Sequence, residues 1–307
     1  MGLREISNVN LMNTLLREKI FSHCSMIAFS IFVSGSFTFG SLIADSIDPE
    51  LLTFYRFLLA TLLLGIILHF KKSIHSNHFK KVWRYFVLGA IYSTYFVFMF
   101  VALKYTTTVS TAAIFTLLPL FAAIMERLFL RKKSPLLIWL ALISSGCGAI
   151  WIIFEGSIIG LLQFRFEKGE AIFLVGTIVY ASYAIIQPKL FKGENIYVTT
   201  FGVLAAGSLI LALSLILQQT SLNSGKISFE TVWVILYLAI FASIGSISCL
   251  NYASPRLSAP IVSAYTLLVP LWVILNDFVF FKVSPSLNLV VGVIIIAFGL
   301  GMLIYKS

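Results

Sequence analysis

Charged residues are scarce in this sequence of 307 residues, and acidic residues are scarcer than basic ones. Asp, Glu, Lys and Arg together make up 11% of the chain, hydrophobic residues make up 59%, and the mean hydropathy is +0.99. A soluble globular domain has roughly a quarter of its residues charged. The composition therefore excludes a soluble domain and makes the lipid bilayer the expected solvent.

Cysteine and histidine are also rare. The three cysteines, Cys24, Cys147 and Cys249, stand in or beside apolar segments and have neither metal-ligand nor disulfide spacing. His75 and His78 have an i, i+3 spacing that could suit a metal in a helix, but they lie in a lysine-rich segment whose natural neighbours are water and anionic headgroups. The sequence predicts no metal and no cofactor.

Motifs for catalysis and ion conduction are missing. The chain has no HExxH, no Gly-x-Ser-x-Gly, no paired aspartates within apolar helices and no phosphate-binding Gly-rich loop. It also lacks a repeated filter loop or rings of like charge. These absences disfavour an intramembrane enzyme, direct ATP hydrolysis and a channel.

Long apolar runs dominate what is present. Runs of about 20 mostly apolar residues are long enough to cross a bilayer as helices, in which every backbone polar group is satisfied internally. The predicted helices lie at about 24–43, 50–70, 84–103, 108–128, 135–155, 169–189, 196–218, 229–253, 258–280 and 285–305. The sequence thus predicts an all-α polytopic membrane protein with ten transmembrane helices.

The net charge of +10 has a one-sided distribution. With the N-terminus inside, fifteen of the 22 Lys and Arg fall in inner segments and five in outer loops, while Arg56 and Arg127 lie within helices. This is the positive-inside pattern, which orients a protein in the membrane. It predicts both termini in the cytoplasm, a plasma (bacterial inner) membrane location with lipids as neighbours, and no nucleic-acid partner.

Two stretches of the sequence repeat one pattern. PLFAAIMERLF begins at Pro119 and PLWVILNDFVF begins at Pro270, 151 residues later; each has Pro-Leu, an aromatic residue and then a carboxylate, Glu126 or Asp277, seven residues after the proline. The spacing is close to half the chain and indicates a duplication. Because each half has an odd number of helices, the halves are expected to be inverted in the membrane, which is typical of secondary transporters.

These stretches, the Ser-Pro that follows each of them, Phe54-Tyr55-Arg56-Phe57, Gly35 in FVSGSFTFG and Gly176 in FLVGTIVYASY resemble the EamA-like members of the drug/metabolite transporter superfamily. The resemblance covers about residues 24–305. It implies a carrier, often an exporter of amino acids or other metabolites, with an importer or exchanger of the same fold as the alternative. The second half departs from the first, because no arginine stands where YVTTFGVLAAG replaces the Arg56 region.

On this basis the chain divides into a cytoplasmic N-terminal segment, 1–22, a first EamA-like repeat, 23–156, and a second, 168–306. Polar and aromatic residues at helical spacing predict a substrate path between the halves; in the sixth helix, Tyr180 and Tyr183 share one face with Gly176 and Gln187. The candidate substrate-binding residues are Ser34, Phe37, Tyr92, Tyr95, Tyr180, Tyr183, Ser246, Asn251, Tyr265 and Trp272.

Such a lining of uncharged donors, acceptors and rings would suit a neutral, zwitterionic or cationic small molecule. The alternative is structural, because small residues commonly mediate helix packing in membranes and Tyr and Trp commonly lie at the interface. The expected partners are a small-molecule substrate and a coupling proton, with the protein a monomer or a homodimer.

Five residues are candidates for gating or coupling. Arg56 is an intramembrane charge, and the alternative is that it reaches outward to Asp48 or Glu50. Pro119 and Pro270 are expected in mid-helix, where they would kink the chain. Glu126 and Asp277 are candidate proton carriers near opposite membrane faces, or simply contacts between helices.

Overall fold

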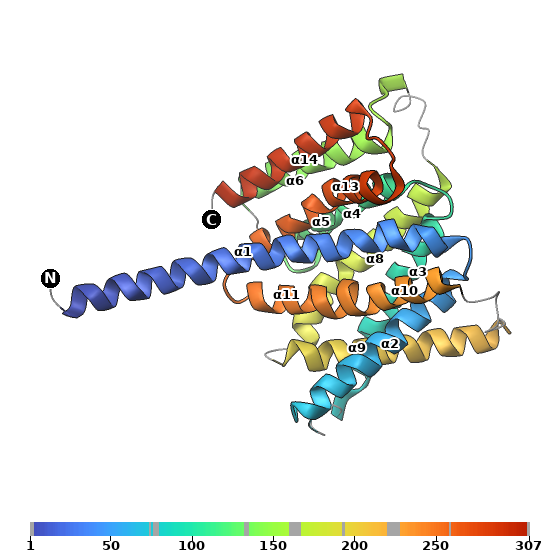
Figure 1. Ribbon diagram of the computed structural model, residues 1–307, viewed down its shortest axis with the longest axis horizontal. Coiled ribbons are helices and arrows are strands. Elements are labelled where there is room, and N and C mark those ends of the chain that lie inside the picture. The colour runs from blue at the N-terminus through green and yellow to red at the C-terminus, as the bar shows by residue number, and fades with distance from the viewer. Residues whose placement is uncertain are drawn as a thin grey trace.

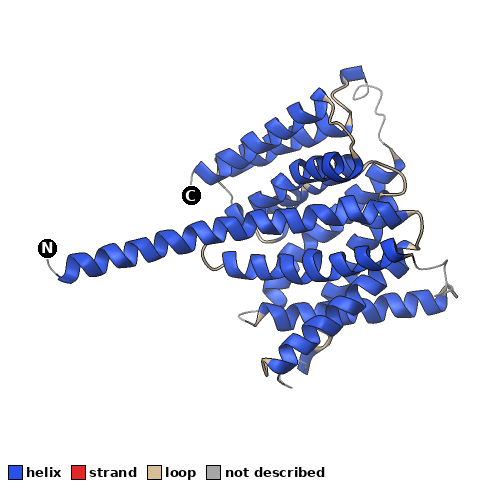
Figure 2. Cartoon of the chain, viewed as in Figure 1, coloured by secondary structure: helices blue, strands red, loops and turns tan. Residues whose placement is uncertain are grey.

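The computed structural model describes residues 3–73, 75, 80–131, 135–159, 167–191, 194–219, 228–257 and 259–305. All regular structure in these ranges is helical (Figure 2). His78 lies outside them, and within them no three His, Cys, Asp or Glu side chains are grouped to hold a metal ion.

The chain folds into a bundle of helices connected by short segments. Nine described helices are long and apolar enough to cross a membrane, and a shorter apolar helix follows near the C-terminus. The elements are α1 (Leu3–Ala44), α2 (Pro49–Phe70), α3 (Trp83–Ala102), α4 (Thr108–Phe115), α5 (Leu118–Phe129), α6 (Leu136–Ile153), α8 (Lys168–Leu190), α9 (Ile196–Leu217), α10 (Phe229–Ala239), η2 (Ile240–Gly245), α11 (Ser246–Ala253), α12 (Ala259–Ala264), η3 (Tyr265–Leu268), α13 (Val269–Phe281) and α14 (Leu287–Tyr305). The predicted all-α polytopic fold is confirmed.

The predicted start of the first helix, near residue 24, is wrong. α1 begins at Leu3, and its N-terminal part extends beyond the ends of the other helices (Figure 1). The reason is that neither glycine nor proline occurs between Leu3 and Gly35, so nothing in the polar segment ends the helix. The part apolar enough to cross a membrane is 17–44.

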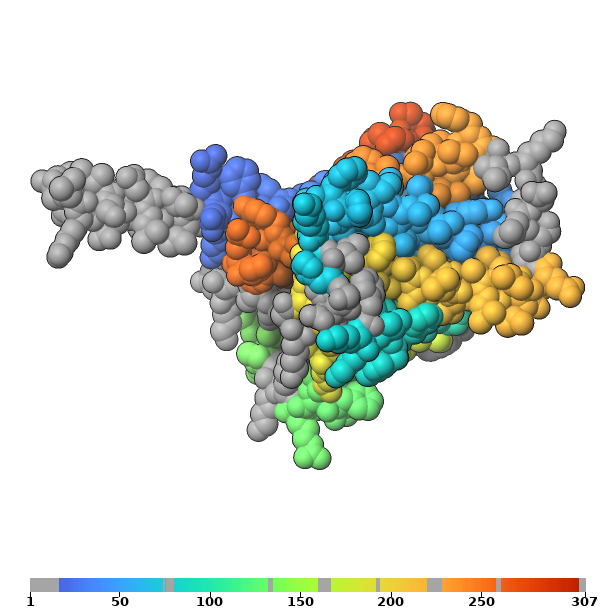
Figure 3. Space-filling view, turned by 90° about the horizontal axis from the view of Figure 1, so that it is seen from below, coloured from blue at the N-terminus to red at the C-terminus, as the bar shows by residue number. Residues whose placement is uncertain are grey.

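α1 runs through the middle of the bundle. It contacts α10 and α11 on one side and α13 and α4 on the other, while α6 and α14 form a pair at one edge (Figure 1). At the opposite edge α2 packs on α9, and the two helices lie side by side on the face seen in Figure 3. α8 packs against α3, α4 and α5 and so connects these groups.

The membrane-spanning segments that contain Pro119 and Pro270 are interrupted helices. α4 ends at Phe115, and Pro119 lies in the first turn of α5; likewise Pro270 lies in the first turn of α13, after the 3₁₀ segment η3. The prolines lie near the middle of the membrane-length segments 108–129 and 261–281, as expected, but each segment is broken into two helical pieces just before its proline. Each proline begins a new helix, where its missing N–H costs no hydrogen bond.

Hydroxyl groups support both interruptions. Thr116 donates to the carbonyl of Ala113 and Thr266 donates to that of Ser263, each over 2.7 Å. Ala113 also accepts from the backbone N–H of Thr116 over 3.0 Å, so in that segment the hydroxyl adds to the tight turn that precedes the proline.

Glycines allow α6 and α14 to approach closely. A Cβ added to Gly299 would lie 2.7 Å from the carbonyl oxygen of Ala141 and against the Ser145 hydroxyl, whereas one added to Gly301 meets nothing within 4 Å. Such close backbone contact is the usual basis of helix association in membranes.

We therefore expect Gly299→Leu to separate α14 from α6 and to lower the free energy of unfolding by about 1–3 kcal/mol, the range for overpacking a close contact. Gly301→Leu, two residues along the same helix, should leave stability unchanged. Thermal unfolding of both purified variants in detergent tests this. Equal Tm values for the two variants would contradict the packing.

Candidate functional site

The Arg56 guanidinium lies inside the bundle. Arg56 is 1% exposed; its Nε donates to Ser243 Oγ over 3.1 Å, and its Nη2 donates to the carbonyl oxygen of Ala242 over 3.3 Å. The Cζ atom stands 3.8 Å from the centre of the Phe96 ring, a cation–π distance. One face and one edge of the cation are thus occupied by protein groups.

A π-helical segment supplies both polar partners of Arg56. Residues Ile240–Gly245 form η2 between α10 and α11, and within it Ser243 donates to the carbonyl of Leu238, five residues earlier. The wider π turn shifts the backbone hydrogen-bond pattern, and π turns within longer helices occur frequently at functional sites. Here the segment presents a hydroxyl and a carbonyl to a buried charge.

Tyrosine side chains surround the guanidinium. Tyr92, Tyr95, Tyr180 and Tyr237 all lie close enough to Arg56 to interact electrostatically. The rings of Tyr95 and Tyr180 stack with centroids 4.4 Å apart, and Tyr183 completes the group at 5.5 Å from Tyr92. We call Arg56, Tyr92, Tyr95, Tyr180, Tyr183 and Tyr237 the arginine–tyrosine cluster.

The cluster draws on both halves of the chain. Arg56 comes from α2 and Tyr92 and Tyr95 from α3, whereas Tyr180 and Tyr183 come from α8 and Tyr237 from α10. Candidate Phe37 extends it through α1, because its ring packs on Phe115 of α4 and Phe173 of α8.

The alternative in which Arg56 reaches outward is wrong. Asp48 caps α2 by accepting from the backbone of Glu50 and Leu51, and the Glu50 carboxylate accepts from Ser214 and Gln218. Among the described residues, no carboxylate lies within ion-pair distance of Arg56, and its Nη1 is buried without a hydrogen-bond partner.

Candidates Tyr265 and Trp272 lie in a different place. Three hydrogen bonds join α1 to the η3–α13 segment: His23 to Tyr265 (2.7 Å), Trp272 to Ser30 (2.9 Å) and Asn276 to Ser34 (3.2 Å). Each pair is separated by 242 residues, so the two segments run parallel in a fixed register. This α1–α13 seam contains Ser34, Tyr265 and Trp272.

The remaining lining candidates lie on α11. Ser246 is buried and donates to the carbonyls of Ala242 and Ser243, and so stabilises the end of the π turn. Asn251 is half-buried one and a half turns further along, on a helix that packs against α1.

Of the two repeated carboxylates, Asp277 is the more deeply buried. It is 8% exposed and accepts a 2.5 Å hydrogen bond on Oδ2 from Thr108, in the first turn of α4. Its Oδ1 and the nearby Thr38 hydroxyl are both buried. Glu126 is half-buried on α5.

A second buried carboxylate, Glu170, was missed by the sequence analysis. It is 3% exposed, accepts from Ser110 and Thr106, and also forms a capping box with Glu167 at the start of α8. The Glu-x-x-Glu spacing before an apolar run could have indicated it. No pattern in the sequence indicated Tyr237 or the π turn as part of the site.

Among the proteins similar to this chain are two transporters and one solved structure. An uncharacterized transporter of Bacillus subtilis, YyaM, is 29% identical over 285 residues, which cover 89% of this chain and 90% of that protein. An uncharacterized transporter of Archaeoglobus fulgidus is 26% identical over 267 residues, covering 85% and 90%. A protein crystal structure with 15% identity shares the fold, with a TM-score of 0.70 over 95% of this chain and 97% of that one.

The EamA-like transporter family matches the chain twice, over residues 20–154 and again over 167–305. The two matches together span most of the sequence, and each contains one of the interrupted segments with its Pro-Leu motif. Membrane-length helices and transporters as relatives agree with this assignment. The protein is an integral membrane protein that belongs to the EamA-like transporter family, as the sequence motifs predicted.

Proposed function

We propose that this protein is a secondary transporter that moves a small metabolite, such as an amino acid, through a path between its two repeats. The main observation in support of this proposal is the arginine–tyrosine cluster, a buried polar and aromatic group built from both matched segments. A site shared by two repeats can change its access when one repeat moves against the other. A packing core would not require a buried guanidinium among phenols.

Alternating access follows most simply from inverted repeats, a first of 23–156 and a second of 168–306. The excess of basic residues in alternate connecting segments supports this topology, with both termini in the cytoplasm. We therefore place the protein in the plasma membrane, with the two halves of opposite orientation. Export is the preferred direction by family resemblance, and an importer or exchanger is the alternative.

The interrupted segments are the proposed moving parts. The breaks at Thr116–Leu117 and at η3 occupy corresponding positions in the two repeats, and each is followed by a proline that cannot continue the preceding helix. Bending at such breaks needs few backbone hydrogen bonds to be disrupted. Pro119 and Pro270 would then set the positions of two hinges.

Asp277 is the proposed coupling carboxylate. It is buried beside the hydroxyls of Thr108 and Thr38, and among the described residues no cation is within ion-pair distance of it. Burial of a carboxylate without a cation favours proton binding, which a proton-coupled carrier requires. Glu126, the corresponding carboxylate of the first repeat, is less buried than Asp277 and is the control residue for the proposed role of Asp277.

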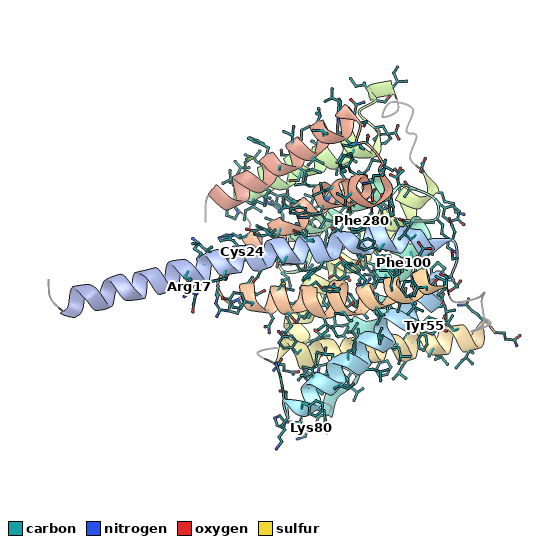
Figure 4. The ribbon with its side chains drawn as sticks, in the orientation of Figure 1. Arg17, Cys24, Tyr55, Lys80, Phe100 and Phe280 are labelled. Atoms are coloured by element: carbon teal, nitrogen blue, oxygen red, sulfur yellow. The ribbon has the colours of Figure 1, made fainter. Side chains whose placement is uncertain are left out.

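Tyr180→Ala should reduce counterflow of a labelled amino acid in proteoliposomes by about 10-fold or more, because it removes the ring that stacks on Tyr95 in the centre of the cluster. Tyr55→Ala is the matched control, since Tyr55, labelled in Figure 4, lines an apolar groove between α2 and α10. An equal loss of counterflow in both variants would argue against a substrate path through the cluster. If the wild-type protein takes up no member of an amino-acid panel, the amino-acid assignment is withdrawn.

Pro119→Ala and Pro270→Ala should each slow counterflow several-fold while leaving substrate affinity nearly unchanged, because alanine allows the helix to continue through the break. Pro135→Ala, at the start of α6 and outside both breaks, is the control. Unchanged transport rates in both hinge variants would contradict the hinge role.

Asp277→Asn should abolish accumulation driven by a pH gradient and preserve counterflow, because asparagine keeps an acceptor for Thr108 but cannot carry a proton. Glu126→Gln is expected to retain pH-driven accumulation. If Asp277→Asn still accumulates substrate against its gradient when only a pH gradient is applied, another group carries the proton.

A further inference from the structure

We propose that Arg56 binds a carboxylate group of the transported molecule, so that the cargo is an amino acid or another organic acid with an apolar or aromatic part. This inference deepens the proposed function and rests on it only in taking the ligand to be the transported solute. It narrows the expected class of substrate, because a site lined only by uncharged groups would also accept a cation.

One nitrogen of the Arg56 guanidinium has no hydrogen-bond partner in the described chain. Phe96 covers one face, Ser243 accepts from Nε and Ala242 accepts from Nη2, which leaves Nη1 buried with no partner in the described chain. A buried donor on a charged group costs more free energy when it is left without a partner than a neutral one does. An acceptor brought by a ligand would remove this cost.

The neighbouring phenols provide further donors. Tyr237 donates to the carbonyl of Phe32 over 3.2 Å, but within the described chain no hydrogen bond engages the hydroxyls of Tyr92, Tyr95, Tyr180 or Tyr183. Tyr92, Tyr180 and Tyr183 also keep part of their surface accessible. The cluster therefore offers a cation and several hydroxyls to one ligand, a set that matches an anionic oxygen group.

Charge balance selects a carboxylate. Among the described residues no acidic side chain is within ion-pair distance of Arg56, so the site is positive before a ligand binds. A cationic ligand would be repelled at low dielectric, and one guanidinium balances a carboxylate but only half of a phosphate dianion. The stacked rings of Tyr95 and Tyr180 can pack against the apolar part of the acid.

Binding by the purified full-length protein in detergent tests the inference, with thermal stabilisation as the readout. The probes are 3-phenylpropionate, L-phenylalanine and L-leucine, each beside its primary amide, together with phenethylamine and phenylphosphonate. We expect the acids to bind at least about 10-fold more tightly than their amides, the scale of a charge-assisted hydrogen bond. Phenethylamine should not stabilise the protein.

Two variants separate recognition from folding. Arg56→Gln should lose the preference for acids over amides, whereas Tyr55→Ala should keep it, because Tyr55 lines the apolar groove between α2 and α10 and lies outside the arginine–tyrosine cluster. If Arg56→Gln does not fold, Arg56→Lys decides: lysine keeps the positive charge but lacks the planar fork of donors, so the preference for acids should fall.

Several results would overturn the inference: equal binding of acids and amides, preference for phenethylamine or phenylphosphonate, no stabilisation by any acid, or an acid preference that survives Arg56→Gln. Acid binding without counterflow of the same acid would leave the role of Arg56 intact and count against transport. Counterflow of amines without acids would leave transport intact and overturn the carboxylate assignment.

Discussion

The burial of one guanidinium is the constraint on which the middle of this bundle depends. An arginine inside a membrane helix costs at least about 2.5 kcal/mol by insertion scales, so it is retained only where protein or water compensates. Here α2 must lie against the π turn of the next repeat so that Ser243 and Ala242 accept from Arg56, while α3 brings Phe96 over the cation. Three segments are thus fixed by one side chain.

The duplication explains why this constraint lies between the halves. Both repeats keep a Pro-Leu motif at the start of a second half-helix, but only the first carries an arginine in its second helix. The second repeat provides the acceptors and three of the tyrosines, Tyr180, Tyr183 and Tyr237, instead. The duplicated halves have therefore become complementary, and neither can form the arginine–tyrosine cluster alone.

Helical periodicity was sufficient to find the part of the cluster that lies on regular helices. Tyr92 and Tyr95 on α3 meet Tyr180 and Tyr183 on α8 because each pair occupies one face of its helix. Tyr265 and Trp272 have equally suggestive spacing, yet they bond to α1, since the rotation of a helix depends on its neighbours. The π turn that holds Arg56 is set by tertiary contacts and has no sequence period, so it could not be predicted.

The two buried carboxylates fasten the first half of the interrupted segment of the first repeat to the second repeat. Asp277 accepts from Thr108 and Glu170 accepts from Ser110, so the first turn of α4 is bound to α13 and α8, both from the second repeat. α5 also packs on α8, but in the part of the chain that the structure describes no hydrogen bond joins its first turn to the second repeat, and the break at Thr116–Leu117 separates it from α4. In the movement that we propose, of the first repeat against the second, this break is the place to bend, because the hydrogen bonds that hold α4 are more costly to lose than a turn that already lacks helical continuity.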